Sequence, residues 1–213
     1  NTFLTDDIAN GRMTVFINVD LSTLENHPGL ARVIIGAFLK AVYNRNGDLK
    51  ERALFLLDEA ARLGYMRVVE TARDAGRKYG ITLLMLFQSL GQMREAFGGR
   101  DATSKWFESA SWVSFAAIND PETAKYISDR CGQTTVEVNQ VSRTSRGSGY
   151  SRTRSKQLSQ RPLIQPHEVM QMRSDEQIVL TSGNPPLRCG RAIYFRRPEL
   201  AALVETNSFQ ASA

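Results

Sequence analysis

Residues 52–64 read RALFLLDEAARLG, and the fold can be worked out from this stretch. Five apolar residues, Ala53 to Leu57, run directly into two carboxylates, Asp58 and Glu59. A short, wholly apolar run is typical of a strand that is buried within a sheet. Adjacent carboxylates repel each other, so their position at the end of such a strand needs a physical reason.

Further short apolar runs before and after residues 52–64 alternate with helical patterns. Together they predict an α/β fold with a mostly parallel sheet and helices on both faces. Strands apolar on both faces, alternating with helices, are typical of that arrangement. The expected strands are residues 13–19, 53–57, 82–88, 112–117, 177–181 and 192–195. The expected helices are residues 28–44, 65–78, 92–97, 105–109, 121–130 and 166–172, with a further helix and a frayed tail in the last dozen residues.

The bulk composition is that of an ordinary globular domain. The chain has 213 residues, 42% of them apolar and 23% charged, and a mild net charge of +5. These values exclude a disordered chain, and no apolar run is long enough to cross a bilayer. Cys131 and Cys189 have no metal-ligand spacing and are expected to be reduced thiols. Because the chain starts at Asn1 and resembles the middle of a domain, we expect it to belong to a longer protein.

The carboxylate pair suggests a nucleotide site. Ligands of parallel sheets bind at the carboxyl ends of the strands, where Asp58 and Glu59 are expected. The Mg²⁺ that accompanies ATP would balance their charge, with Asp58 in the metal's coordination shell and Glu59 orienting the attacking water. An apolar strand followed by Asp-Glu is the Walker B pattern of P-loop ATPases. An acidic helix cap explains the same two residues, and the pair alone leaves both interpretations open.

Two further residues are candidates for the same site. Gln88 ends the next strand, so a parallel pairing would put it at the same edge as Asp58 and Glu59, within reach of the γ-phosphate or the attacking water. Arg77 precedes that strand and should lie at the opposite edge. That position suits an arginine finger that reaches a neighbouring subunit's nucleotide, although spacing alone favours a simple helix C-terminal cation.

Several blocks resemble one known family. They read FLLDEAARLG, GRKYGITLLMLFQSLGQ, AAINDPETAKYISDRCGQTTVEV and RPLIQPHEVMQM, in that order. The chain resembles the VirD4/TraG-type coupling proteins, the ATPases of conjugation and type IV secretion, from about Asp7 to Tyr194. The resemblance implies a RecA-like P-loop NTPase core that uses ATP and Mg²⁺, with Asp58, Glu59 and Gln88 acting in cis and Arg77 as the arginine finger in trans.

The resemblance also implies an assembly, a location and partners. It implies a homo-hexamer at the cytoplasmic face of the bacterial inner membrane, which delivers relaxase-bound DNA or protein effectors to a type IV secretion channel. The phosphate-binding G-x-x-x-x-G-K-[ST] is absent from the 213 residues, so the Walker A half should lie upstream. We therefore expect the isolated chain not to hydrolyse ATP. Lys78, where many relatives carry Gly, leaves the placement of Arg77 open.

A basic segment follows the expected nucleotide-binding core. Between Val138 and His167 there is no acidic residue, while six residues are basic and many are Ser or Gly. We expect residues 1–137 to form the core, residues 138–165 to form a flexible basic segment, and residues 166–213 to complete the domain. A solvated loop explains this composition, and so does sequence-independent binding of DNA. The DNA hypothesis names Arg143, Arg146, Arg152 and Arg154.

Two functions from different classes remain open. The first is an ATP-driven DNA or protein translocase. The second is a non-catalytic docking module that binds a relaxase or a secreted substrate without hydrolysing ATP. The coding sequence upstream of Asn1 discriminates between them, because a Gly-rich Lys-Ser/Thr loop and membrane-spanning segments there would support the translocase.

Overall fold

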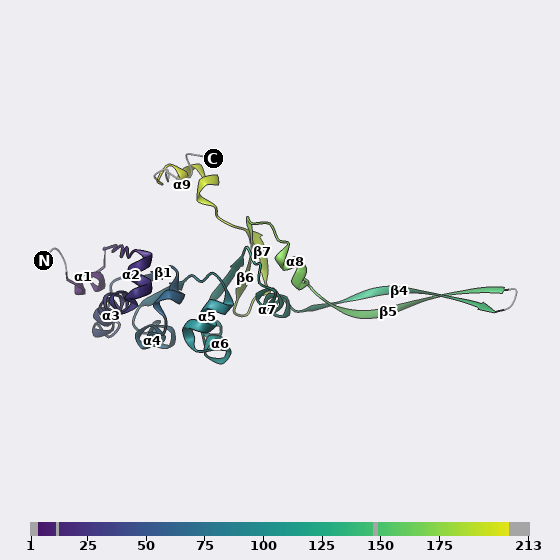
Figure 1. The fold of residues 1–213 in the computed structure, drawn as a ribbon, viewed down its shortest axis with the longest axis horizontal. Coiled ribbons are helices and arrows are strands. Elements are labelled where there is room, and N and C mark those ends of the chain that lie inside the picture. The colour runs from purple at the N-terminus through teal and green to yellow at the C-terminus, as the bar shows by residue number, and fades with distance from the viewer. Residues whose placement is uncertain (1–3, 12, 147–148, 205–213) are drawn as a thin grey trace. The chain divides into compact units, whose positions relative to one another are not determined.

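The computed structural model describes residues 4–11, 13–146 and 149–204, with the side chains of residues 142–153 left out. The chain divides into two compact units, Asn1–Ala110 and Ser111–Ala213. Figure 1 shows the helices and strands of both units in chain order. The expected helix and tail at the end of the chain fall mainly on residues 205–213, outside the described part.

The first unit contains a two-stranded parallel sheet. Its strands, β1 (Ala53–Leu57) and β2 (Ile81–Met85), pair in register from Ala53 with Ile81 to Leu57 with Met85. The helices of this unit are α1 (Asp6–Ala9), α2 (Leu21–Asn26), α3 (Pro28–Asn44), the 3-10 turn η1 (Ala60–Leu63), α4 (Arg67–Ala75), α5 (Leu90–Phe97) and α6 (Arg100–Ser109). The predicted parallel relation of these two strands is confirmed.

One face of this sheet carries the core of the unit. Phe55 and Leu57 of β1 are buried and belong to a cluster that includes Leu39 of α3, which has no exposed surface. Leu54 and Leu56 point to the other face and are 59% and 56% exposed. The expectation that helices cover both faces is therefore wrong for β1 within the described residues, because alternate strand residues face opposite sides and only one side is packed.

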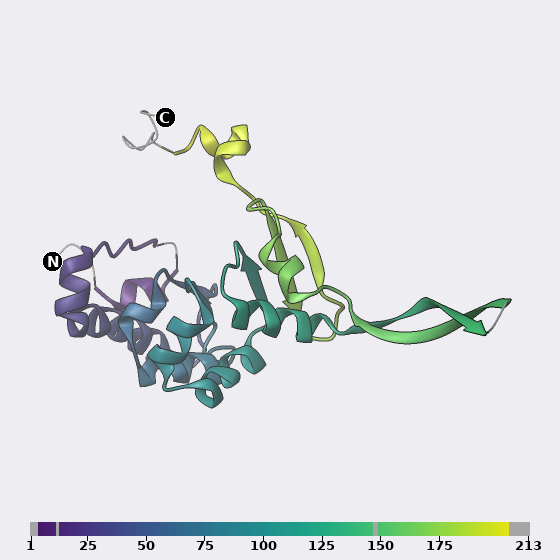
Figure 2. The same ribbon diagram turned by 45° about the vertical axis from the view of Figure 1, so that its right-hand side comes forward.

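The second unit combines an antiparallel sheet with a long two-stranded ribbon. β3 (Trp112–Ala116) pairs with β6 (Glu176–Thr181), which pairs with β7 (Leu187–Gly190). The helical elements are α7 (Pro121–Cys131), α8 (Pro166–Met170), η2 (Tyr194–Arg196) and α9 (Pro198–Ala201). The ribbon consists of β4 (Gln133–Arg146) and β5 (Gly149–Pro162), which run side by side in both views (Figures 1 and 2).

The expectation of a mostly parallel sheet is only partly correct. Of the four strand pairings among the described residues, only β1 with β2 is parallel. An apolar run shows that a strand is buried but says nothing about its direction. Between β3 and β6 the chain forms α7, the ribbon and α8, and it returns antiparallel to β3.

Three other local expectations differ from the structure. Residues 13–20 have no regular structure, because a strand needs a partner for its backbone groups and none pairs with them in the described part of the chain. The strand expected at residues 192–195 lies earlier, as β7. Most of the segment expected to be a flexible loop is paired strand, since β-branched Val and Thr recur up to Gly147 without a Pro or Gly to interrupt them.

Candidate functional site

The ends of β1 and β2 bring the predicted site residues together. Beyond the strands the pairing continues, with Leu86 N donating to Leu57 O at 3.0 Å. Three residues after Met85, the amide Nε2 of Gln88 donates to Oε1 of Glu59 at 3.1 Å. The prediction that Gln88 shares an edge with the carboxylate pair is therefore confirmed as geometry.

Glu59 has an unusual backbone conformation. Its φ of 47° and ψ of 42° lie in the left-handed region, which non-glycine residues rarely occupy. Its backbone N–H donates to Oδ1 of Asp58 at 2.9 Å. Such conformations persist where surrounding contacts fix them, and they cluster at functional sites. The turn ends the strand, and it leaves Asp58 exposed and Glu59 half-buried.

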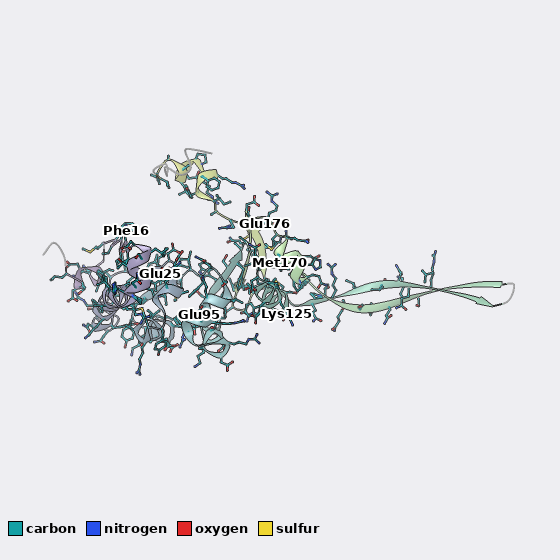
Figure 3. All side chains as sticks on the ribbon, viewed as in Figure 1. Phe16, Glu25, Glu95, Lys125, Met170 and Glu176 are labelled. Carbon is teal, nitrogen blue, oxygen red and sulfur yellow. The ribbon has the colours of Figure 1, made fainter. Side chains whose placement is uncertain are left out.

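Arg62 holds Glu59 from the side opposite Gln88. Three residues after Glu59, in η1, its Nε donates to Oε2 of Glu59 and its Nη1 donates to Oε1 of Glu25 at 2.5 Å. Glu25 belongs to α2 and is labelled in Figure 3. Both carboxylate oxygens of Glu59 therefore have a donor, Gln88 on one and Arg62 on the other.

The sequence analysis did not single out Arg62 or Glu25. The position of Arg62 three residues after Glu59 was a usable signal, because residues at that spacing meet on one side of a helical turn. Glu25 had no local signal, since it lies 37 residues from Arg62 along the chain. A second contact was missed as well, because Nε2 of Gln92 in α5 donates to Oε1 of Gln88 at 3.2 Å.

The hydrogen bond from Arg62 lowers the pKa of Glu59 below its ordinary value, and the charge of Arg62 and the amide of Gln88 act in the same direction. Glu59 is therefore ionised at neutral pH and can only accept hydrogen bonds. The linked residues Glu25, Asp58, Glu59 and Arg62 comprise three carboxylates and one guanidinium, a formal charge of −2. The positive charge that the sequence argument required is thus supplied in part by Arg62, and a divalent cation would balance the remainder.

The donor set fits Mg²⁺ at Asp58. Mg²⁺ is usually held by one or two carboxylates, with phosphates and water completing its shell. Asp58 is exposed, and in the described residues its Oδ2 accepts no hydrogen bond. No group of three or more His, Cys, Asp or Glu that could hold a metal unaided occurs in that part of the chain. The phosphate oxygens of a nucleotide would have to supply the other ligands.

A pocket of about 580 Å³ opens beside this site, within the size range of small-molecule sites. It lies in the first unit and is lined by Glu59, Ala61, Arg62, Gly64, Tyr65, Gln92, Glu95 and Ala96. The turn that forms its wall is fixed by Arg32 of α3, whose Nε donates to Leu63 O at 2.5 Å. Gly64 has a φ of 61° and a ψ of −158°, a backbone region that is essentially restricted to glycine, so the turn requires glycine.

Arg77 lies at the opposite edge of the sheet. It follows α4 and accepts, through its carbonyl oxygen, a hydrogen bond from Gly80 N at 3.3 Å, just before β2 begins. Because β1 and β2 are parallel, this edge is the one away from Asp58 and Gln88. Arg77 is exposed and has no ion pair with another described residue.

The predicted DNA-binding arginines all lie on the β4–β5 ribbon. Arg143 and Arg152 are register partners, Arg154 lies opposite Val141, and Arg146 lies opposite Gly149. Only Arg154 among these four has a described side chain, and it is exposed. Lys156 donates to Oε2 of Glu137 at 3.0 Å, and both side chains are largely exposed.

No helix in the described part of the chain has the length and apolarity that a membrane crossing requires. Cys131 and Cys189 are both free thiols. Burial raises the pKa of Cys131, which makes it a poor nucleophile at neutral pH.

A family model described as "Type IV secretory system Conjugative DNA transfer" matches residues 1–213. The conjugal transfer protein TraG of Rhizobium radiobacter is 71% identical over 210 residues, which is 99% of this chain and 33% of that protein. The type IV secretion system coupling protein VirD4 of Bartonella henselae is 54% identical over 217 residues, covering the whole chain and 33% of that protein. The chain thus spans about a third of the length of these relatives.

Solved structures show the same fold. The plasmid coupling protein TrwB in complex with ADP and Mg²⁺ superposes with a TM-score of 0.68 at 17% identity, over 91% of this chain and 43% of that one. An unbound form of the TrwB protein gives a TM-score of 0.62 at 19% identity, over 81% of this chain and 39% of that one. The fold is accordingly that of the coupling protein TrwB.

Proposed function

This chain belongs to the type IV secretory system conjugative DNA transfer family, and on that basis we propose that it is part of an ATP-driven translocase that delivers DNA or protein to a secretion channel. The observation that carries the proposal is the 3.1 Å hydrogen bond between Gln88 and Glu59. It joins the ends of two parallel strands at the edge where α/β sheets bind their ligands.

Within this proposal, three residues act in cis on ATP and Mg²⁺. Asp58 would hold the Mg²⁺, which would balance the charge of the triphosphate. Glu59, which is ionised at neutral pH, orients the attacking water and accepts its proton. Gln88 contacts the γ-phosphate or that water, and its hydrogen bond to Glu59 keeps the two side chains in register.

Arg77 acts in trans in this proposal. Its exposure at the sheet edge away from Asp58 supports contact with the nucleotide of a neighbouring copy rather than its own. An arginine supplied in this way stabilises the charge that develops during phosphoryl transfer. The arrangement requires an oligomer, and a homo-hexamer is the assembly that we propose.

Family membership supports our proposal for the translocated substrate and the setting. We propose sequence-independent contact with DNA through Arg143, Arg146, Arg152 and Arg154 of the ribbon. The protein partners would be a relaxase or secreted effectors and the components of the secretion channel, at the cytoplasmic face of the inner membrane. The phosphate-binding loop would come from outside residues 1–213, so the isolated chain is expected to lack ATP hydrolysis.

The test is ATP turnover by the full-length protein carrying Glu59→Gln, which keeps the shape of the side chain and removes its charge. Turnover should fall about 10²- to 10⁴-fold with nucleotide binding retained, as expected for the loss of a general base. Glu51→Gln is the matched control, because Glu51 is exposed just before the other end of β1. Unchanged turnover in Glu59→Gln would refute the role of Glu59, and turnover by the isolated 213-residue chain would refute its dependence on an outside loop.

A non-catalytic docking module remains the second candidate. Its support is that the described surface of β1 exposes Leu54 and Leu56, as a docking surface can. A full-length protein that binds relaxase equally well with Glu59 or Gln at position 59, and that never hydrolyses ATP, would establish it.

A further inference from the structure

The net charge of the chain is concentrated in the β4–β5 ribbon. Residues 133–162 contain six basic residues and one acidic residue, Glu137. Subtracting these from the 27 basic and 22 acidic residues of the whole chain leaves 21 of each. The remaining residues are therefore neutral in sum, and the ribbon alone accounts for the +5.

The strand register divides the ribbon into two faces. Residues that lie directly opposite each other in an antiparallel pair share a face, and successive residues alternate between faces. We define the basic face as the odd-numbered residues of β4 with the even-numbered residues of β5, and the neutral face as the remaining residues of both strands.

Charge is distributed unequally between these faces. On the basic face, three successive register pairs hold four cations: Asn139 with Lys156, Val141 with Arg154, and Arg143 with Arg152. On the neutral face, Arg146 and Arg161 lie at the two ends, and only Ser, Thr, Val and Gln occur between them. Arg161 pairs with Glu168, its Nη2 donating to Oε1 at 2.8 Å. On the basic face, Lys156 has a comparable exposed pair with Glu137 at 3.0 Å.

The described side chains of the ribbon form no core of their own. Every described residue from Glu137 to Val141 and from Arg154 to Arg161 is exposed, and Leu158 is 70% exposed. An isolated two-stranded hairpin is only marginally stable in water. A partner that contacts both strands along one face would therefore stabilise the ribbon as well as bind to it.

We propose that the basic face of the ribbon binds the phosphate backbone of duplex nucleic acid, and that the neutral face takes no part. The proposal rests on the proposed function only in taking DNA as the substrate. It changes the set of contact residues, because Lys156 joins Arg143, Arg152 and Arg154, whereas Arg146 falls on the other face.

Charge spacing and composition favour a duplex. Residues on one face of a strand recur about every 6.8 Å, which is about twice the 3.4 Å rise per phosphate along one strand of DNA. The major groove is wide enough to admit a two-stranded β-ribbon. Binding of single strands usually depends on stacking of bases on aromatic side chains, and Tyr150 is the ribbon's single aromatic residue.

Two variants of the 213-residue chain with identical composition test the assignment. The cross-face variant moves two arginines to the neutral face: Ser151→Arg, Arg152→Ser, Thr153→Arg and Arg154→Thr. The same-face variant moves two arginines along or across the basic face: Ser145→Arg, Arg152→Ser, Val141→Arg and Arg154→Val. Net charge, length and the number of substitutions are the same in both.

The measurement is the affinity for a fluorescent 20-base-pair duplex as a function of NaCl concentration, with circular dichroism to confirm folding. The cross-face variant should lose about 1.8 from the slope of log K against log salt, about 0.9 per displaced cation. The same-face variant should keep the wild-type slope, and single-stranded DNA should bind more weakly than the duplex.

Each outcome has a defined meaning. A wild-type chain that binds no duplex overturns the proposal together with the DNA contacts under the proposed function. Wild-type binding with equal slopes for both variants overturns only the assignment to one face. A cross-face variant that loses binding to anionic lipid vesicles or polyglutamate but not to DNA also overturns it, because the basic face would then serve another partner.

Discussion

At the carboxyl ends of β1 and β2, Glu25, Glu59 and Arg62 each have a defined partner, whereas on the β4–β5 ribbon Arg154 is exposed and Lys156 has only a solvent-exposed one. The first region is built on a packed core and a fixed backbone turn at Glu59. The described residues of the second region show neither.

The difference teaches how each region can work. Catalysis of phosphoryl transfer depends on positioning and on preorganised charge, so a change of one atom at the strand ends should matter greatly. Contact with a phosphate backbone depends on the number of cations that a face presents, so the ribbon should respond in small, graded steps. The two regions should therefore separate experimentally.

The largest effect is expected from Arg77→Ala in the full-length protein. Loss of an arginine finger lowers phosphoryl-transfer rates by about 10³- to 10⁵-fold, so ATP turnover should fall in that range. Duplex binding by the ribbon should be unchanged. Arg67→Ala is the matched control, because Arg67 is exposed at the start of α4, the helix that precedes Arg77.

Mixing subunits then tests whether Arg77 acts in trans. Arg77→Ala and Glu59→Gln subunits should each be nearly inactive alone, whereas mixed oligomers should contain interfaces where an intact Glu59 meets an intact Arg77. ATP turnover should therefore recover partly on mixing. Absence of recovery, in oligomers shown by mass measurement to be mixed, would mean that Arg77 acts within its own subunit or not at all.

A smaller effect is expected from Leu39→Ala, which tests whether the packed core serves only the first region. Leu39 of α3 has no exposed surface and packs in the cluster that includes Phe55 and Leu57 of β1. Its truncation should lower the free energy of unfolding of the first unit by about 2 to 5 kcal/mol. Urea denaturation followed by the fluorescence of Trp106, in a Trp112→Phe background, measures it.

Leu158→Ala on the ribbon is the matched comparison. This leucine is 70% exposed, so its truncation should change the free energy of unfolding of the second unit by less than about 0.5 kcal/mol. Duplex binding should survive both substitutions at temperatures where the second unit is folded. If Leu39→Ala abolished duplex binding under those conditions, the separation of the two regions would be wrong.

The two regions also differ in how well the sequence predicted them. The strand-end site was largely predictable, because β1 is a clean apolar run, the carboxylates follow it directly, and a parallel partner fixes where Gln88 must lie. Arg62 was within reach by its spacing from Glu59. Glu25 was not, because its contact depends on how α2 folds back on η1, which no local pattern encodes.

The ribbon was predicted poorly, and for a physical reason. Its Ser and Arg content resembles a solvated loop, and strand pairing over 14 residues is a non-local property. The alternation that separates the charged face from the neutral face becomes visible only when the register is known. The antiparallel pairing of β3 with β6 was not predicted either, because burial alone does not set strand direction.

Arg62→Met sharpens the account of the strand-end site through its pH dependence. The hydrogen bond from Arg62 lowers the pKa of Glu59, so removing the donor raises that pKa towards its ordinary value. Protonated Glu59 cannot accept a proton, so its proposed role as the base predicts that activity falls as the pH falls through its pKa. The acid limb of kcat/KM for ATP should therefore move to higher pH in the full-length protein.

Glu25→Gln provides the opposite case. This substitution removes the charge of Glu25, the second carboxylate that Arg62 contacts. Arg62 keeps its hydrogen bond to Glu59, so the acid limb of the pH profile should not move to higher pH. Arg67→Met, on the exposed start of α4, should leave the limb where it is. A limb that stays fixed in Arg62→Met would show that the titrating group is not Glu59.

The smallest effect is expected on the ribbon, from Glu137→Gln in the 213-residue chain. Glu137 is the ribbon's single acidic residue and pairs with Lys156 at 3.0 Å, and both side chains are largely exposed. Such pairs are weak, so the substitution should release one cation for phosphate contact without unfolding the ribbon. The salt slope should steepen by up to about 0.9, so the loss of affinity between 50 and 200 mM NaCl should be roughly threefold larger.

Asp129→Asn is the matched control for Glu137→Gln. Asp129 is an exposed acid in α7 of the same unit, outside the basic face, so removing its charge should leave the slope unchanged. Equal steepening in both variants would mean that the total charge of the unit, rather than the charge on one face of the ribbon, governs binding.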